Sequence, residues 1–371
     1  MKITFPHMGN LYIILAAFFE NLGIDFIVPP PITKKTIELG AMYSPEFACF
    51  PLKINVGNFI EALEMGADTI LMAGGIGPCR FGYYAQVEKE ILTDLGYKCN
   101  MVVLEPPKGN LKEVLFQIYK LLQGKDLNNI IKAAKIAWMK AKALEEIEKE
   151  VFFYRAREKV KGMTTKLYRK ALRIIHETKE IDSIKSSIER INEEFKGIEI
   201  KKDHDPLRIG LVGEIYTLLE PSSNMNIEET LGELGAEVEK SIRLTEWTNT
   251  NLILDMLRIK GELKCRTAAK PYLNYFVGGH GLESVGETVL YANSGVDGVI
   301  HLAPFTCMPE IVAQSILPRV SKEKNIPVIT MMLDEHSAEA GFRTRIEAFV
   351  DLLEKKREEK LYYEQKLLSW D

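Results

Sequence analysis

Residues 66–79, GADTILMAGGIGPC, and residues 295–307, GVDGVIHLAPFTC, are near-copies of one segment. Each contains Gly-x-Asp, an apolar stretch of strand length, a short loop with Gly or Pro, and a cysteine. An apolar run of this length bounded by turn residues is typical of a buried strand. The repetition therefore predicts a chain built from two similar α/β halves, in each of which a strand leads to a thiol.

Strand and helix patterns alternate on both sides of these segments, as they do in parallel α/β sheets. In the first half we expect strands at 2–5, 24–28, 69–73 and 101–104, and helices at 11–22, 34–39, 51–65 and 82–95. In the second half we expect strands within 208–216 and at 298–301 and 327–333, and helices at 227–234, 248–260, 282–293, after 309 and at 337–360. The predicted fold class is α/β, with two flavodoxin-like or Rossmann-like parallel-sheet domains.

Between the halves, from about 111 to 195, the pattern changes to long, charged helices with apolar residues at i, i+3 and i+4. Such a stripe is far more often a packing surface than a cofactor site, so we interpret this part as a helical subdomain or a partner-facing arm. The polar run KKDHDP at 201–206 is a linker. The predicted domains are 1–108, a helical insertion with its linker at 109–205, and 206–371.

Composition limits the classes of partner. The 371-residue chain carries a net charge of −4, which gives no overall attraction to nucleic acid or an anionic membrane. Its first residues, MKITFPHMGNLYIILAAFFE, lack the cleavage region of a signal peptide, and no run reaches the ~18 apolar residues that a bilayer span needs. We expect a cytoplasmic protein with neither nucleic-acid nor membrane partners.

The five cysteines are spread along the chain, and no two of them form a CxxC pair. An odd number in a long chain indicates reduced thiols and not a disulfide framework. The missing CxxC pair excludes the common zinc and ferredoxin spacings. Any metal site must therefore combine distant segments.

Cys49, Cys79 and Cys307 share one context, in which a loop leads into the start of a helix. Pro51 and Pro309 suit a first helical turn because the missing N–H costs nothing there. The positive end of a helix dipole favours the thiolate, which is the form that binds soft metals. One buried cysteine is usually a small hydrophobe. Three in the same context favour a metal site, and an iron–sulfur site is the leading hypothesis.

The two remaining cysteines are weaker candidates for a fourth ligand. Cys99 alternates with apolar residues at the entrance of a strand, which favours packing, and Cys265 lacks the strand and the Pro/Gly loop. Three thiolates on a cubane cluster leave one iron open to water, sulfide or substrate.

The glycine loop GGHG at 278–281 opens a helix and can offer backbone amides to an anion, although such loops also serve as plain turns. It matches neither the dinucleotide-binding pattern nor a Walker loop. Within the loop, His280 is a candidate hydrogen-bond donor to substrate or cluster, or a structural histidine.

Charged residues at strand ends are candidates for acid–base work. His7 and Glu214 follow the first strand of each half, and Glu335 follows the strand at 327–333. Strand ends of open α/β sheets face the ligand crevice, but helix capping explains such residues equally well. Arg80, next to Cys79, could balance cluster or substrate charge or form a surface salt bridge. The candidate catalytic residues are His7, Arg80, His280 and Glu335.

Several longer motifs make the chain resemble the 2-hydroxyacyl-CoA dehydratase family, and within it the branch called CoA-protein activase. They are FPHMGN, ACFPLKINVGNFIEALEMGAD, GGIGPCRFGYY, GGHGLESVGETVLYANSGVDGVIHLAPFTCMPE and DEHSAEAGFRTRIEAF, and they cover both α/β halves. The resemblance implies that Cys49, Cys79 and Cys307 are the ligands of a single 4Fe-4S cluster, since a double cubane would require more cysteines. It also implies anaerobic electron transfer from a separate ATP-dependent iron–sulfur activator protein. No ATPase motif is visible in this chain.

These observations leave three functional hypotheses. The first is an iron–sulfur reductase or acyl-CoA dehydratase-like lyase acting on a small molecule, with a CoA thioester as candidate substrate. The second is a non-catalytic cluster carrier or electron-transfer adaptor that docks through the helical part. The third is a metal-free binding module with buried cysteines. Two-subunit assemblies are common in the family, so a homodimer or heteromer is expected. The fourth iron decides between the first two hypotheses.

Overall fold

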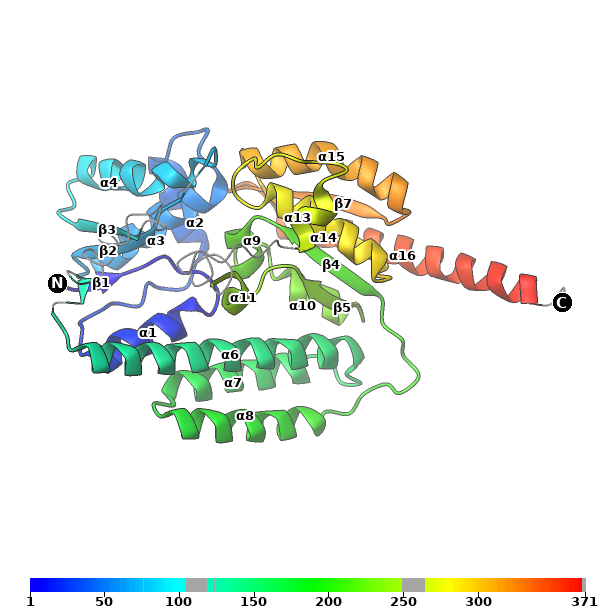
Figure 1. Cartoon of the computed structure of the whole chain (residues 1–371), viewed down its shortest axis with the longest axis horizontal. Helices are drawn as coiled ribbons and strands as arrows, with labels where there is room; N and C mark the ends of the chain where they lie inside the picture. The colour runs from blue at the N-terminus through cyan, green and yellow to red at the C-terminus, as the bar shows by residue number, and fades with distance from the viewer. Residues whose placement is uncertain (76, 105–118, 120, 123, 249–263, 369–371) are drawn as a thin grey trace.

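Two parallel sheets lie side by side, and a layer of long helices runs along one flank of both (Figure 1). The computed structural model describes all residues except 76, 105–118, 120, 123, 249–263 and 369–371. The two sheets confirm the α/β fold class predicted from the sequence. The expected helix at 248–260, the start of the helical middle and the predicted boundary at 108 fall largely outside the described residues. The domain boundaries therefore stay predictions.

The N-terminal sheet has the strand order β1-β2-β3, all parallel. Its strands are β1 (Ile3–Thr4), β2 (Thr69–Ala73) and β3 (Asn100–Leu104), and its helices are α1 (Leu11–Leu22), α2 (Lys34–Tyr43), α3 (Phe50–Glu64), the 3₁₀ turn η1 (Arg80–Tyr83) and α4 (Tyr84–Asp94). The strand expected at 24–28 is only a bridge between Phe26 and Ile3, so that prediction is wrong in extent. Three prolines at 29–31 prevent the pairing from continuing beyond this bridge, because they cannot donate to a ladder.

The C-terminal sheet has the parallel order β5-β4-β6-β7. Its elements are β4 (Arg208–Gly213), α9 (Ile215–Leu219), α10 (Ile227–Glu233), β5 (Glu237–Lys240), α11 (Leu244–Thr248), α13 (Lys264–Ala269), α14 (Gly281–Asn293), β6 (Gly298–Pro304), α15 (Met308–Lys324), β7 (Val328–Leu333) and α16 (Glu339–Leu368). Counting the Phe26 bridge, both halves place their first strand between the second and the third. Chain connections therefore leave the two central strands in opposite directions, which opens a crevice at the carboxyl ends of the strands.

The repeated Gly-x-Asp has the same role in both halves. Gly66 (φ +98°) and Gly295 (φ +75°) follow the ends of α3 and α14 in the left-handed conformation, which glycine adopts readily. Asp68 accepts a hydrogen bond from the Lys2 backbone N–H at 2.9 Å, and Asp297 accepts one from the Arg208 N–H at 2.8 Å. Each aspartate thus connects the starts of two neighbouring strands, β1 and β2 in the N-terminal sheet and β4 and β6 in the C-terminal sheet.

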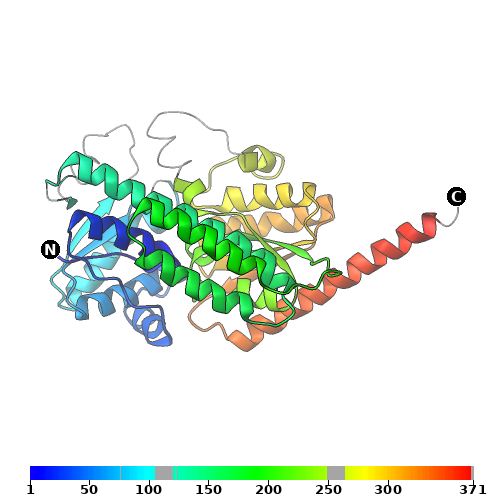
Figure 2. The same cartoon turned by 90° about the horizontal axis from the view of Figure 1, so that it is seen from below.

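The helical layer consists of α6 (Leu127–Arg157), α7 (Met163–Glu177) and α8 (Ile181–Lys196). Their shared core includes Ile136, Ala143, Ile147, Ala171, Ile175, Ile184, Ile191 and Phe195. At 31 residues α6 is about 46 Å long. It packs on α1 of the N-terminal half and on α10, α11 and β5 of the C-terminal half. One long helix therefore contacts both halves of the chain, and Figure 2 shows from below how the helical layer lies across both of them.

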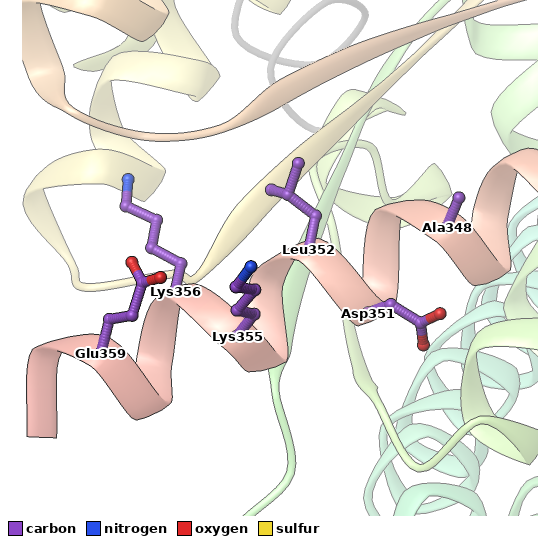
Figure 3. Close-up of a pocket in the computed structure, with 6 residues that line it drawn as sticks. All are labelled: Ala348, Asp351, Leu352, Lys355, Lys356 and Glu359. Atoms are coloured by element: carbon purple, nitrogen blue, oxygen red, sulfur yellow. The ribbon is translucent and has the colours of Figure 1, made fainter. Parts of the chain in front are cut away.

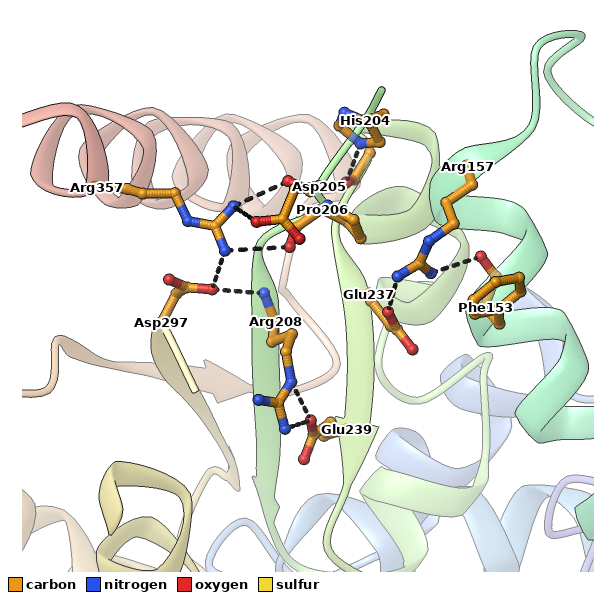
Figure 4. A network of polar contacts seen from close by, with 11 residues as sticks. Phe153, Arg157, His204, Asp205, Pro206, Arg208, Glu237, Glu239, Asp297 and Arg357 are labelled. Carbon is orange, nitrogen blue, oxygen red and sulfur yellow. Dashed lines mark hydrogen bonds and ion pairs between the residues drawn. The ribbon is translucent and has the colours of Figure 1, made fainter. Parts of the chain in front are cut away.

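Ion pairs fasten this layer and the linker to the C-terminal sheet. The buried Lys240 of β5 pairs with Glu148 of α6 at 3.0 Å and with Glu228 of α10 at 2.7 Å. Arg357 of α16 donates to the Asp205 carbonyl at 2.9 Å and pairs with Asp297 at 3.3 Å, as Figure 4 shows. The linker at 201–206 is thus held between α16 and the strands. No helix of the described residues is long and apolar enough to cross a membrane.

Candidate functional site

Three cysteines stand at the starts of helices. Cys49 is the N-cap of α3, Cys79 that of η1 and Cys307 that of α15, and all three have extended backbone angles. Proline in the first turn of α3 and of α15 fits the positions predicted for Pro51 and Pro309. We call Cys49, Cys79 and Cys307 the thiol site.

All three thiols are free, and the segments that carry them come from both halves and are joined by bonds from Arg80 to the Phe47 and Thr306 carbonyls. Burial raises the pKa of Cys49 to about 12, and it also raises the pKa of Cys79 and of Cys307. Backbone N–H groups oppose this rise by donating hydrogen bonds to the sulfurs. Leu52 donates to Cys49, Phe81 to Cys79 and Glu310 to Cys307.

The sequence indicated that helix ends favour the thiolate, and in the structure burial opposes this effect. The desolvation cost of a thiolate exceeds the stabilisation from the helix ends, so without a cation the thiols remain protonated at neutral pH. A bound metal ion replaces such protons. Within the described residues, no three His, Cys, Asp or Glu side chains are close enough to hold one metal ion. A cubane cluster is wider than one ion, so its ligands stand further apart.

Two neighbours of the thiol site were missed by sequence reasoning. The Tyr84 hydroxyl of α4 contacts the Cys49 sulfur. Glu310, in the first turn of α15, is fully buried; its Oε2 lies 2.8 Å from His301 Nε2 and accepts from the Ser284 hydroxyl at 2.8 Å. Its other oxygen has no hydrogen-bond partner among the described residues. The one sequence signal for Glu310 is its position three residues after Cys307.

Arg80 connects the three segments that carry the thiols. Its guanidinium donates to the Phe47 carbonyl at 2.9 Å and to the Thr306 carbonyl at 2.6 Å. These carbonyls lie just before Cys49 and Cys307, while Arg80 itself follows Cys79. Thr306 adopts φ +63°, which is unusual for a β-branched residue. The side chain proposed from the sequence as a charge-balancing residue therefore holds loops together in this structure.

The glycine loop at 278–281 packs directly against the thiol site. A Cβ on Gly278 would stand 2.5 Å from the Cys79 backbone nitrogen, and one on Gly281 would stand 2.3 Å from the Pro309 carbonyl oxygen. Both positions therefore require glycine for close approach. His280 is the N-cap of α14, and its charge acts on Glu214.

His7 and Glu335 have partners in the opposite half of the chain. His7 Nδ1 lies 3.1 Å from Glu220 Oε2, and the His7 carbonyl accepts from the Tyr216 hydroxyl at 2.7 Å. Glu335 forms a buried ion pair with Lys53 of α3. Both side chains join the halves, and a role in acid–base chemistry stays a prediction.

Cys99 and Cys265 occupy different surroundings. Cys99 packs against the hydrophobic cluster of the N-terminal half that includes Phe59 and Leu92. Cys265 is buried in α13, where its charged neighbours are Glu283 and Glu287. These contacts agree with packing roles for both cysteines.

Two surface hollows lie outside the thiol site. One is formed by a single face of α16, where Figure 3 shows Leu352, Lys355 and Glu359 along the helix. The other is an apolar groove between α1, α6 and α11, lined by residues that include Phe18 and Trp138. No residue of the thiol site lines either hollow.

Comparisons with known proteins agree with the family resemblance. A family profile described as the CoA enzyme activase uncharacterised domain matches residues 6–241, which is more than half of the chain. A second, described as 2-hydroxyglutaryl-CoA dehydratase, D-component, matches residues 283–353. The first range contains Cys49 and Cys79 and the second contains Cys307. No curated protein matches the chain.

Proposed function

Because the chain belongs to the CoA enzyme activase family, which is related to the 2-hydroxyacyl-CoA dehydratases, we propose that it binds one 4Fe-4S cluster through the thiol site. The proposed role is low-potential, one-electron chemistry on a small molecule. The observation that supports the proposal is that three free thiols, each at a helix start, lie on segments of both halves that Arg80 joins by bonds to the Phe47 and Thr306 carbonyls.

The residues present fit such a cluster. Thiolates are the ligands that iron–sulfur clusters require, and the positive ends of three helical elements favour a bound anionic group. Backbone N–H groups of Leu52, Phe81 and Glu310 point to the sulfurs, and such hydrogen bonds raise the reduction potential of a cluster. The cluster would supply an electron to the bound small molecule. Arg80 and the glycine loop would fix the spacing of the ligands.

The family also supports partners for this role. We propose that an ATP-dependent iron–sulfur activator delivers the electron and that a CoA thioester is the substrate class. His280 and Glu335 are the proposed groups for holding or moving protons near the site. If the protein is instead a cluster carrier or electron-transfer adaptor, the cluster would still bind but would not respond to substrate.

Anaerobic purification tests the cluster directly. We expect about four irons and four sulfides per chain, visible absorption, and an electron paramagnetic resonance (EPR) signal after reduction. Cys79→Ala should lose most of the iron, because one of three ligands is gone. Cys99→Ala is the matched control and should keep it. Unchanged iron content and spectrum in Cys79→Ala would refute the proposal.

A second measurement separates the enzyme from the carrier. A 2-hydroxyacyl-CoA thioester is added to the reduced, cluster-loaded protein, and the EPR spectrum is recorded. A shifted spectrum supports a substrate-binding site beside the cluster. An unchanged spectrum at saturating thioester contradicts the enzymatic role and favours the carrier.

A further inference from the structure

The last helix, α16, extends beyond the body of the molecule. Its first half packs on the core of the C-terminal sheet through residues that include Phe342 and Leu353. Arg357 still reaches the linker and Asp297. Beyond Arg357 the helix runs clear of both sheets to its end at Leu368, as Figures 1 and 2 show. Most helical stability in proteins comes from the packing of one face, so a helix end that leaves the body points to a partner outside the chain.

A row of exposed side chains runs along α16 outside the face that packs on the sheet. Its members follow one another at spacings of four and three residues: Ala348, Leu352, Lys355, Glu359 and Tyr362. Side chains at these spacings share one helix face. The first four line the shallow hollow of Figure 3. We call this row the pairing stripe; it continues for about 21 Å from the sheet-bound half of the helix onto its projecting end.

Two large apolar side chains stand near the ends of the pairing stripe. Leu352 is 52% exposed and Tyr362 is 62% exposed. Lys355 and Glu359 lie between them and carry opposite charges. The stripe therefore combines apolar contacts with a charge pattern, which is the combination that sets orientation when two helices pair.

This charge pattern is complementary to itself in one orientation. Positions 355 and 359 share a midpoint at 357, and so do positions 352 and 362. When two copies of α16 run antiparallel about a two-fold axis at this midpoint, Lys355 of each copy faces Glu359 of the other, and Leu352 faces Tyr362. A parallel pair would instead set Lys355 against Lys355 and Glu359 against Glu359. Like charges at these places repel, so the stripe selects the antiparallel pair.

We propose that two copies of this chain form an antiparallel dimer through the pairing stripe of α16. The projecting end of each helix covers the sheet-bound half of the other, so Tyr362 of one copy removes Leu352 of the other from water. The same surface serves both copies, and the two-fold axis closes the assembly at two chains. The inference depends on neither the thiol site nor its proposed cluster.

Sedimentation of the full chain over a concentration series tests the dimer. We expect wild type to pass from monomer to dimer as its concentration rises. Lys355→Glu and Glu359→Lys each set like charges opposite one another at two symmetric places, so each should raise the dissociation constant about tenfold or more. Mixing the two variants in equal amounts should restore the dimer, because each copy then supplies the charge that the other lacks.

Glu354→Lys is the matched control, because it reverses the charge of an exposed residue of α16 outside the stripe. It should dimerise as wild type, and circular dichroism should show equal helix content in all variants. A wild type that stays monomeric throughout the series would overturn the inference, and so would a dimer that neither single reversal weakens. The inference also fails if the two variants stay monomeric when mixed, because the stripe would then face another protein or solvent.

Discussion

The buried ion pair between Lys53 and Glu335 should couple the two halves of the chain, and a double-mutant cycle can measure this. Lys53 lies in α3 with its side chain 4% exposed, whereas Glu335 follows β7 and is 13% exposed. Removing one partner of a buried pair costs about 3–5 kcal/mol because the other charge stays buried. Glu335→Gln should reach that range, since the Lys53 ammonium cannot regain water. Lys53→Met should cost less, about 1–3 kcal/mol, because Glu335 can turn toward solvent.

The double variant Lys53→Met with Glu335→Gln leaves no buried charge, so we expect it to be more stable than Glu335→Gln alone. The assay is denaturation in urea at pH 7, followed by tryptophan fluorescence and by circular dichroism so that separate unfolding of the halves is visible. A coupling energy of about 2 kcal/mol or more is expected for a pair of this burial. Single effects that simply add in the double variant would refute the reasoning.

Two further predictions concern Arg80 and Glu88. Arg80→Met removes the bonds to the Phe47 and Thr306 carbonyls, so it should destabilise the metal-free protein by about 1–3 kcal/mol and speed labelling of the thiols by a disulfide reagent. Arg80→Lys should label at an intermediate rate, and equal rates in all three proteins would contradict the role. Burial raises the pKa of Glu88 from 4.5 to about 8. Between pH 4.5 and pH 8 the folded state therefore keeps a proton on Glu88 that the unfolded state has lost. Wild type should therefore lose stability relative to Glu88→Gln as pH rises from 5 to 8, by a few kcal/mol at most; parallel pH profiles in denaturant would argue against it.

Much of the fold was predictable because its signals are local. The two Gly-x-Asp segments predicted two equivalent strands. In each, a left-handed glycine ends the preceding helix, and the aspartate accepts a hydrogen bond at the start of the sheet. The thiols at helix starts were predictable for the same reason, because Pro51 and Pro309 mark first turns. Each of these signals lies within a few residues of the feature it predicts.

Features that depend on distant contacts could not be predicted in this way. The edge strand β5 reads EVEK, and its buried Lys240 is explained only by the carboxylates of α6 and α10. Arg80 donates to backbone carbonyls, which every residue possesses, so no sequence pattern marks its acceptors. Glu335 was visible as a residue at a strand end, but its ion pair with Lys53 of the other half depends on how both halves pack.

The division of the thiol site between two halves also sets an order of events during synthesis. The ribosome must add 228 residues (307 − 79) after Cys79 before Cys307 exists. At about 5–20 residues per second this takes roughly 10–45 s. During that interval Cys49 and Cys79 have no third sulfur, and Arg80 lacks its Thr306 acceptor. The newly made N-terminal half is therefore the stage at which oxygen or a stray metal ion can react with an incomplete thiol site, and loading of the proposed cluster would have to wait until Cys307 has been made.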